Sequence, residues 1–337
     1  MSLAGPTWKN CSGGWYSRPL LLSKAIRTVT AKPPKPKLVI ILGPTAVGKS
    51  EVALDLAALV GAEIINADSQ QVYRYMDIGT GKPSAAERER VRHHLIDIID
   101  PDQEFNVATF RRLATAAASD IQRRGKMAIV CGGTGLYLKA LTQGLFTGPA
   151  QDLAIRERLN AEADRAGLAS LYQRLERVDP QAMSRIHPND RQRIVRALEV
   201  FELTGRAISD WQKEHAFAES LFETLKIGLQ RERAELYDRI NERCDRMIAD
   251  GFMDEVKALL NKGYGVDLKP LQTIGYRHTG LVIRGEASAE EALALMKRDT
   301  RRLAKQQLTW FRGDRDIQWL HPDEKKEIRA AVESFLS

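Results

Sequence analysis

The sequence predicts an α/β protein in which a parallel sheet is flanked by helices and an all-helical subdomain is inserted. Two observations support this. From Lys37 to about residue 143, short apolar runs rich in β-branched residues alternate with segments of helical spacing, which is typical of strand–helix–strand units. Residues 151–214 then show helical periodicity alone, and strand character returns at 225–229. An all-helical block between two strand-containing stretches indicates an insertion into an α/β domain.

The elements can be placed one by one. Strands are expected at residues 38–42, 63–66, 94–99, 127–131, 225–229 and 317–320. Helices are expected at 50–60, 106–125, 134–143, 152–166, 168–178, 190–203, 234–250, 253–262 and 288–311. Asn106 can cap the second helix, and Ser288 with Glu291 forms a capping box before the last. The predicted parts are a disordered leader at 1–36, a first core part at 37–143, a helical insertion at 144–224, and a return to the core at 225–337 with basic C-terminal helices.

Composition narrows the class of protein. The 337 residues are 43% hydrophobic and 28% charged, which is ordinary for a globular chain. The longest apolar run is about five residues, so no membrane segment is expected. Three widely separated cysteines argue against disulfides and zinc sites and favour a reducing, cytoplasmic location. The net charge of +7 resides in residues 1–37, which hold seven basic and no acidic residues. The absence of acidic residues in that leader resembles a transit peptide, but a disordered leader, an early start codon or a cloning remnant at residues 1–3 is the preferred interpretation.

One motif predicts a phosphate site. Residues 43–50 match G-x-x-x-x-G-K-[ST] in full, between an expected strand and an expected helix. Backbone N–H groups in such a loop curl around phosphate oxygens, Lys49 neutralises the terminal phosphate, and the Ser50 hydroxyl can ligate Mg²⁺. The motif is typical of nucleotide-binding and ATP-binding proteins and predicts a P-loop NTPase-like sheet. The phosphate-binding residues are then Gly43, Pro44, Thr45, Ala46, Val47, Gly48, Lys49 and Ser50.

The acidic magnesium ligand of an NTPase is missing from its usual place. The strand expected at 127–131 runs into Gly-Gly-Thr-Gly-Leu-Tyr without a carboxylate. The strand at 63–66 is instead followed by Asp68, which would lie at the C-terminal edge of the sheet, where α/β folds bind ligands. Asp68 could alternatively cap the next turn, and Thr134 could merely cap its helix.

Five stretches together resemble the tRNA dimethylallyltransferase family, that is, the tRNA prenyltransferases or isopentenyl-diphosphate:tRNA isopentenyltransferases. They are the P-loop, Asp-Ser-Gln-Gln-Val-Tyr at 68–73 with Asp-Ile-Gly-Thr-Gly-Lys-Pro at 77–83, Gly-Gly-Thr-Gly-Leu-Tyr at 132–137, His-Pro-Asn-Asp-Arg-Gln-Arg-Ile-Val-Arg at 187–196, and Lys-Gln-Gln-Leu-Thr-Trp-Phe-Arg at 305–312. The resemblance spans about residues 38–320.

The resemblance implies a reaction. The family transfers a dimethylallyl group from dimethylallyl diphosphate to N6 of the adenosine 3′ to the anticodon, in tRNAs that read codons beginning with U. The P-loop would then hold the diphosphate of the donor rather than that of ATP, with Mg²⁺ on Ser50. By resemblance the catalytic residues are Asp68 as the base, Thr134 as an orienting group, and Lys49. A base helps because the acceptor amine is a weak nucleophile.

The resemblance also implies contacts with the tRNA anticodon stem-loop. A local excess of basic residues at 297–315 agrees with it, although a solvated, salt-bridged face is the alternative. We expect a monomer whose helical insertion closes on the RNA. The expected tRNA-binding residues are Asp68, Ser69, Gln70, Gln71, Thr134, Arg156, Gln192, Arg193, Ile194, Val195, Arg196, Gln272, Thr273, Ile274, Gly275, Tyr276, Arg277, Lys305, Gln306, Gln307, Leu308, Thr309, Trp310, Phe311 and Arg312.

Three alternatives stay open at this point. A prenyltransferase acting on free AMP or ADP would share the P-loop and Asp68 but would need neither a helical insertion nor a basic terminal helix. A small-molecule kinase would need a nucleotide-base pocket and an arginine-rich lid. A non-catalytic RNA-binding protein with a relict P-loop conflicts with intact Lys49, Ser50 and Asp68.

Overall fold

The computed structural model describes residues 35–144, 148–214 and 220–337. The expected leader therefore lies outside the described residues, apart from Lys35 and Pro36. The carbonyl of Pro36 accepts a hydrogen bond from the Glu223 N–H at 3.0 Å. The sheet pairing thus begins one residue before the expected start of the core.

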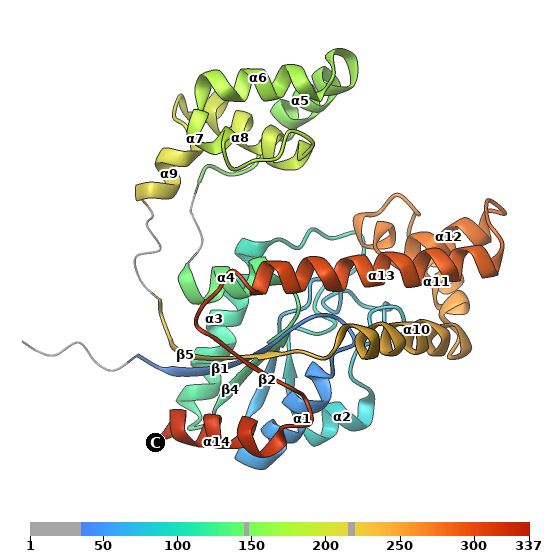
Figure 1. Ribbon diagram of the computed structural model, residues 1–337. Coiled ribbons are helices and arrows are strands. Elements are labelled where there is room, and N and C mark those ends of the chain that lie inside the picture. The colour runs from blue at the N-terminus through green and yellow to red at the C-terminus, as the bar shows by residue number, and fades with distance from the viewer. Residues whose placement is uncertain (1–34, 145–147, 215–219) are drawn as a thin grey trace, which may run out of the picture. The chain divides into compact units, whose positions relative to one another are not determined.

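A six-stranded, wholly parallel sheet forms the centre of the fold, as the sequence predicts (Figure 1). The strand order is β3-β2-β4-β1-β5-β6. The apolar strand β1 lies between β4 and β5 and is buried along nearly its whole length, because both neighbours and both faces cover it. The strands are β1 (Lys37–Leu42), β2 (Glu63–Asn66), β3 (His93–His94), β4 (Ala128–Gly132), β5 (Glu223–Leu229) and β6 (Ile317–Leu320).

The third strand is shorter than expected. The prediction of strand over 94–99 is wrong beyond His94, because Leu95 and Asp97 adopt positive φ values of 63° and 56°. Such left-handed residues cannot continue a parallel ladder. The chain after β3 instead bends back, and the Ile98 N–H donates to the carbonyl of Val72. This bend holds the loop that follows β2 in place beside the sheet edge.

The helices of the sheet-containing part follow the predicted spacing closely. Asn106 caps α3 through the Thr109 N–H, and Ser288 with Glu291 forms the expected capping box of α13. Helices α2, η1, α12 and α14 were not predicted. These helices are α1 (Lys49–Val60), α2 (Ala85–Arg90), α3 (Val107–Arg123), α4 (Gly135–Gln143), α10 (Arg233–Ala249), α11 (Phe252–Asn261), η1 (Lys269–Gln272), α12 (Tyr276–Ile283), α13 (Ala289–Phe311) and α14 (Lys325–Leu336).

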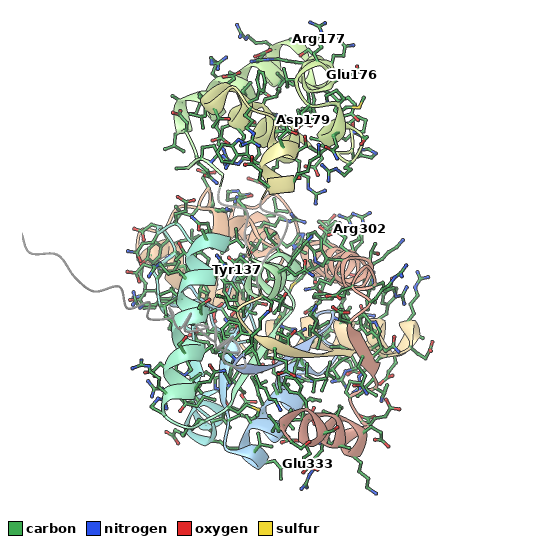
Figure 2. All side chains as sticks on the ribbon, turned by 90° about the vertical axis from the view of Figure 1, so that its left-hand side faces the viewer. Tyr137, Glu176, Arg177, Asp179, Arg302 and Glu333 are labelled. Atoms are coloured by element: carbon green, nitrogen blue, oxygen red, sulfur yellow. The ribbon has the colours of Figure 1, made fainter. Side chains whose placement is uncertain are left out.

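The predicted inserted block forms helices between residues 153 and 214 and has a hydrophobic core of its own, and strand β5 begins at Glu223, two residues before the predicted return to the core. Leu159, Leu171, Leu175 and Leu198 are buried together there, so the block does not depend on the sheet for its core. In Figure 2 Asp179 lies in this block, where its carboxylate accepts from the Ala182 and Ser209 N–H groups. Its helices are α5 (Leu153–Ala166), α6 (Leu168–Val178), α7 (Pro180–Met183), α8 (Arg191–Thr204) and α9 (Ile208–Glu214).

A charged cluster lies at the start of β2, at the opposite end of that strand from Asp68. Glu63 is buried and accepts hydrogen bonds from Arg124 at 2.5 and 2.7 Å, His94 at 2.8 Å and Lys126 at 3.1 Å. The Arg124 guanidinium, followed by His94 and Lys126, holds the pKa of Glu63 well below its usual range, against the opposing effect of burial. The cluster therefore stabilises the fold only while Glu63 is ionised.

The contribution of this cluster to the free energy of unfolding should therefore fall at acid pH. A carboxylate with a lowered pKa contributes stability above its unfolded pKa of about 4.3, and the contribution fades as the pH falls further. We expect Glu63→Gln to lower the free energy of unfolding at pH 7 by about 1.5–3 kcal/mol, the range for hydrogen bonds to charged groups, since it removes the carboxylate that Arg124, His94 and Lys126 share. The difference from wild type should shrink between pH 5 and 3. Urea unfolding followed by circular dichroism measures it, with Glu333→Gln, which removes a surface ion pair with Arg329, as the control. A difference independent of pH would contradict the assignment.

Candidate active site

The P-loop lies between β1 and α1, as its motif predicts. Its backbone turns through left-handed conformations at Ala46 and Gly48, with φ values of 64° and 109°. Gly43 is required by close approach, because a Cβ there would lie 2.7 Å from the carbonyl oxygen of Leu229 on β5. The loop therefore wraps tightly over the C-terminal end of the sheet, next to the N-terminus of α1, where an anion is stabilised.

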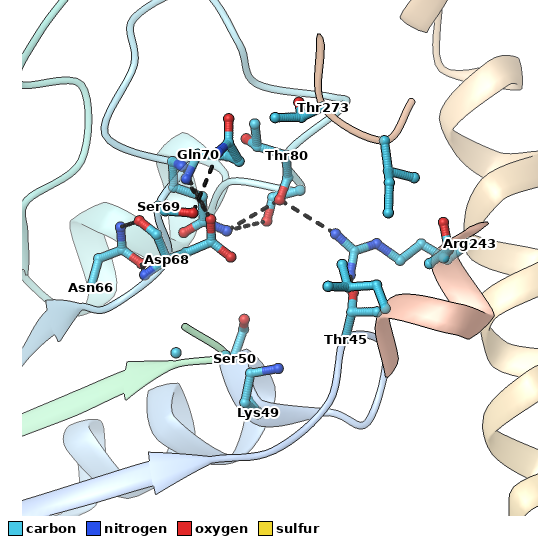
Figure 3. Close-up of a pocket in the computed structure, with 18 of the residues that line it drawn as sticks. Thr45, Lys49, Ser50, Asn66, Asp68, Ser69, Gln70, Thr80, Arg243 and Thr273 are labelled. Atoms are coloured by element: carbon cyan, nitrogen blue, oxygen red, sulfur yellow. Dashed lines mark hydrogen bonds between the residues drawn. The ribbon is translucent and has the colours of Figure 1, made fainter. Parts of the chain in front are cut away.

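Three arginines hold the P-loop from outside, and the sequence analysis did not identify them. The Nε of Arg231 donates to the Val47 carbonyl at 3.0 Å, and the Nε of Arg239 donates to the Ala46 carbonyl at 3.1 Å. Arg243 donates to the Thr45 hydroxyl at 2.9 Å and projects from α10 into the pocket (Figure 3). About two hundred residues separate these arginines from the loop, so only the tertiary structure could reveal them.

Lys49 and Ser50 face a cavity of about 400 Å³ (Figure 3). Lys49 donates a 2.7 Å hydrogen bond to the Pro44 carbonyl, which keeps the ammonium group folded over the loop. Burial lowers the pKa of Lys49 to about 8, although the negative charge of Asp68 opposes the shift. Lys49 is therefore a cation at neutral pH and loses its charge as the pH rises above about 8.

Asp68 lines the same cavity, across from the P-loop (Figure 3). One of its oxygens, Oδ1, accepts from the Gln70 N–H at 2.7 Å and, more weakly, from the Gln71 N–H at 3.4 Å. The residue thus caps its turn and also lines the cavity, so the two interpretations from the sequence are compatible. The Asn66 side chain accepts from the Asp68 N–H at 3.1 Å and fixes the backbone there.

Thr134 belongs to the loop between β4 and α4, beside Asp68. Its hydroxyl accepts from the Ser69 N–H at 3.2 Å instead of capping α4. Thr134 thus occupies the N-cap position of α4 without capping the helix through its side chain, and it is not among the residues that line the cavity. The contact ties the end of β4 to the loop that carries Asp68.

Gln307 turns inward from α13. Its Oε1 accepts from the Thr45 N–H at 2.8 Å, and its Nε2 donates to the Gly133 carbonyl at 3.0 Å. The residue lines the cavity and bridges the P-loop to the end of β4. Gln307 is one of the expected tRNA-binding residues of α13, and its side chain also orders the phosphate loop.

The other expected tRNA-binding residues divide by burial. The side chains of Ile194, Val195, Tyr276 and Phe311 are at most 4% exposed, so any contact of these residues with tRNA would come from their backbone. They lie within helical motifs, and a helix always turns some of its side chains to the core. In contrast, polar and aromatic members are exposed: Gln192, Arg193, Gln272, Arg277, Lys305, Gln306, Thr309, Trp310 and Arg312. Half-buried members include Ser69, Gln70, Gln71, Thr134, Arg156, Arg196, Thr273, Ile274 and Leu308, and Gly275 is buried.

Neighbouring charges hold several of the expected RNA-contacting arginines. The buried carboxylate of Glu199 accepts from Arg156 at 3.0 Å and from Arg196 at 2.9 Å. Asp299 on α13 likewise accepts from Arg277 at 2.5 Å and from Arg302 at 3.2 Å. Arg302 itself projects outward from α13 (Figure 2). Such pairing limits the number of conformations available to each side chain, but it leaves the outward N–H groups free to meet an anion.

The described residues offer no ready-made metal cage. Within residues 35–144, 148–214 and 220–337, no three His, Cys, Asp or Glu side chains are arranged to hold an ion. In the same part of the chain, no helix combines the length and apolar character needed to cross a bilayer.

The fold and the site define a P-loop α/β protein whose cavity is lined by Lys49 and Ser50 on one side and by Asp68 on the other. A family model described as IPP transferase matches residues 71–314. The tRNA dimethylallyltransferases of Geobacter metallireducens and Geobacter sulfurreducens are both 53% identical, over 89% and 85% of this chain and 98% and 92% of their own. The chain belongs to the tRNA dimethylallyltransferase family.

Solved structures agree with this placement. The tRNA isopentenylpyrophosphate transferase of Bacillus halodurans is similar over 90% of this chain and 97% of its own, with a TM-score of 0.68 and 40% identity. A eukaryotic dimethylallyltransferase acting on tRNA is similar over 85% of this chain and 74% of its own, with a TM-score of 0.71 and 29% identity. Family membership removes the small-molecule kinase and the relict RNA-binding protein from the alternatives.

Proposed function

We propose that the protein transfers a dimethylallyl group from dimethylallyl diphosphate to N6 of the adenosine 3′ to the anticodon in tRNAs that read codons beginning with U. The supporting observation is a single cavity that has Lys49, Ser50 and Arg243 on one side and Asp68 on the other. Cations suit a diphosphate leaving group, and a carboxylate suits an amine that must lose a proton. The protein acts in the cytoplasm as a monomer.

The proposed reaction accounts for each bond that breaks or forms and for the proton that N6 loses. The bond between the allylic carbon and the diphosphate oxygen breaks, and its electron pair leaves with the diphosphate. The N6 lone pair forms the new carbon–nitrogen bond, and Asp68 accepts the N6 proton. The products are N6-(dimethylallyl)adenosine and diphosphate. Lys49, Arg243 and the P-loop amides stabilise the charge that develops on the leaving oxygen.

A magnesium ion fits the phosphate side of the cavity. The exposed Ser50 hydroxyl lies at the position that ligates Mg²⁺ in P-loops, and Mg²⁺ usually takes few protein ligands together with substrate phosphates and water. When bound, the ion would add Lewis-acid stabilisation to the diphosphate.

Product analysis separates this function from the remaining alternative. Incubation with labelled dimethylallyl diphosphate should label unmodified tRNA, and nucleoside digestion should place the label on adenosine. Free AMP and ADP in parallel reactions should take up no label. Labelling of the free nucleotides in preference to tRNA would identify the other class of prenyltransferase.

Lys49 predicts a pH dependence for donor binding. The ammonium is charged below its pKa of about 8 and becomes neutral above it. The Kd for dimethylallyl diphosphate should therefore be nearly constant between pH 6 and 7 and should rise above pH 8, approaching about tenfold per pH unit. Lys49→Arg keeps its charge throughout and should flatten this rise. If the Kd of the wild-type protein for dimethylallyl diphosphate stayed constant up to pH 10, the charge of Lys49 would not determine donor affinity.

Basic side chains on α13 predict a salt dependence for tRNA binding. About four to six phosphate contacts should give a log–log slope of Kobs against salt between about −3 and −5. Because Arg301 is half-buried whereas Arg302 and Lys305 are exposed, Arg302 and Lys305 are the better residues to reverse. Their double change to Glu should flatten the slope, whereas Lys326→Glu on α14 should not. A wild-type affinity insensitive to salt between 50 and 200 mM would rule out a phosphate clamp.

A further inference from the structure

The loop at residues 77–81 forms one wall of the cavity, and the reaction has so far given it no role. The carbonyl of Thr80 accepts from Arg243 at 3.3 Å and from the Gln71 side chain at 3.3 Å. Gln71 also donates to the carbonyl of Gly81 at 3.1 Å. The loop thus joins the arginine on the donor side to the segment that carries Asp68, and its position sets the distance between them.

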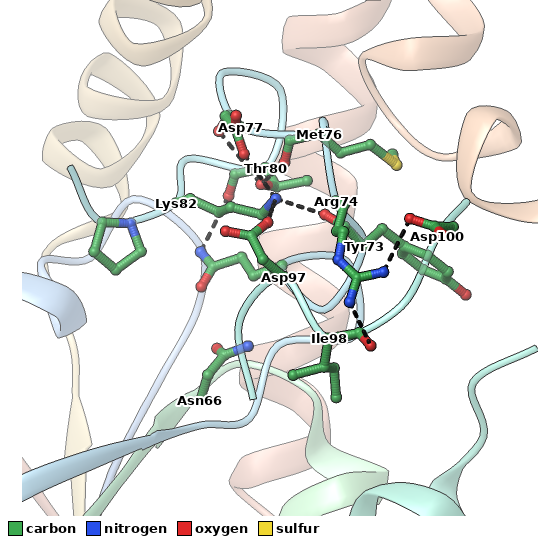
Figure 4. A network of polar contacts seen from close by, with 12 residues as sticks. Asn66, Tyr73, Arg74, Met76, Asp77, Thr80, Lys82, Asp97, Ile98 and Asp100 are labelled. Atoms are coloured by element: carbon green, nitrogen blue, oxygen red, sulfur yellow. Dashed lines mark hydrogen bonds and ion pairs between the residues drawn. The ribbon is translucent and has the colours of Figure 1, made fainter. Parts of the chain in front are cut away.

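The loop is anchored toward the core through Lys82 (Figure 4). The ammonium group donates to the carbonyl of Tyr73 at 2.5 Å, to Asp77 at 2.7 Å and to Asp97 at 2.5 Å. The Lys82 side chain is 1% exposed, so its bond to the Tyr73 carbonyl is shielded from water, whereas the Asp77 carboxylate that it reaches is exposed. The C-terminal end of the loop is therefore fixed to the sheet-containing part independently of any ligand.

A second anchor comes from α11. The carboxylate of Glu255 accepts from three consecutive backbone N–H groups, those of Asp77 at 2.8 Å, Ile78 at 2.6 Å and Gly79 at 3.1 Å. It also accepts from the hydroxyl of Tyr276 at 2.6 Å. Four donors saturate the acceptor capacity of a carboxylate. Burial and the charge of Glu255 raise the pKa of Tyr276, so its hydroxyl stays protonated and keeps donating.

Close packing strengthens this second anchor. A Cβ on Gly79 would lie 2.2 Å from the ring of Phe252 and 2.6 Å from the ring of Tyr276, so only glycine fits there. The two rings meet edge to face with centroids 4.9 Å apart. A shift of Tyr276 therefore moves the loop through direct contact as well as through Glu255.

Tyr276 also belongs to the part of the site that is expected to bind tRNA. It opens α12 and follows Thr273 and Ile274, which line the same cavity, within the 272–277 segment expected to bind tRNA. Exposed Gln272 and Arg277 flank this buried tyrosine. We propose that Tyr276 and Glu255 are positioning residues that couple tRNA binding on segment 272–277 to donor binding against loop 77–81. This inference rests on the proposed function, because it assigns tRNA and the allylic diphosphate to the two sides.

The coupling is measurable as a ratio of affinities. The Kd of dimethylallyl diphosphate is measured with and without saturating tRNA whose target adenosine is replaced by a nucleoside lacking N6, so that no turnover occurs. We expect wild type to bind the donor at least about fivefold more tightly with tRNA, and to bind tRNA more tightly by the same factor with the donor present. Tyr276→Phe removes one hydroxyl and leaves the three amide bonds of Glu255, so the coupling should fall below about twofold.

Two further variants separate positioning from folding. Glu255→Gln places an NH₂ group against backbone N–H donors, so donor affinity without tRNA should fall about tenfold and the coupling should vanish. Asp254→Asn, an exposed neighbour paired with Lys257, should behave as wild type in every measurement. Melting temperatures confirm that each variant is folded.

The outcomes are distinct. Two results would overturn the inference while leaving transfer to tRNA intact. In the first, Tyr276→Phe retains the wild-type coupling. In the second, the wild type binds the donor equally tightly with and without tRNA. Failure of the wild type to label tRNA at all would instead overturn the proposed function. Loss of coupling in Tyr276→Phe, with donor affinity in the absence of tRNA changed by less than about twofold, supports the inference.

Discussion

Replacing Asp68 by Asn is expected to lower the single-turnover rate of transfer by about 10²–10⁴-fold, the range that a general base contributes. The change is nearly isosteric. The amide oxygen of the replacement side chain can still accept from the Gln70 N–H, which preserves the 2.7 Å bond that shapes the loop. The variant should therefore keep its structure and lose only the group that takes the N6 proton.

The affinity of Asp68→Asn for tRNA distinguishes a role of Asp68 in the chemical step from a role in binding. The Kd for tRNA should change by less than about threefold, because the effect belongs to the transition state. Asp55→Asn on α1, where Asp55 pairs with Arg90 and Lys325 at the surface, is the matched control and should retain the wild-type rate. An Asp68→Asn rate within about threefold of wild type would remove Asp68 as the base.

Replacing Lys49 by Ala is expected to have the next largest effect. The ammonium group faces the cavity beside the P-loop amides, and its removal takes away a preorganised charge from the leaving diphosphate. Loss of one such donor costs about 10²–10³-fold in rate. Donor binding should weaken as well, since the same charge contacts the ground-state diphosphate, whereas tRNA affinity in the absence of donor should be unchanged.

The same experiment tests which diphosphate the loop holds. The usual carboxylate after the P-loop partner strand is absent, since β4 ends in Cys131 and Gly132. We therefore expect the wild-type protein not to hydrolyse ATP in the absence of tRNA, and ATP not to compete with dimethylallyl diphosphate at millimolar concentration. Robust ATP hydrolysis that Lys49→Ala abolishes would assign the loop to a nucleotide instead.

The local features of this protein were predictable from its sequence. The P-loop, the strand before it and the helix after it follow from a short stretch whose glycines, lysine and serine meet their ligand through neighbouring backbone groups. Asp68 could be placed for the same reason, because the C-terminal ends of parallel strands share one edge of a sheet. The caps of α3 and α13 are equally local, since a cap joins residues three positions apart.

The motifs were less informative about the direction of individual side chains. Ile194 and Val195 lie within a basic stretch of α8, yet they belong to the core of the helical block. Gln307 lies within a basic stretch of α13, yet it bridges the P-loop and β4. A motif fixes which residues occur together, whereas the packing partner of the helix decides which of them face inward.

Only the tertiary structure decided which distant groups complete the site. Arg243 reaches Thr45 across 198 positions of sequence, and Glu255 reaches the N–H of Asp77 across 178. No periodicity or spacing records such pairs, because they arise where α10 and α11 happen to pack against the loops at the sheet edge. The chemistry of the reacting groups is local and therefore readable in the sequence, but their positioning depends on long-range packing, which is a property of the whole fold.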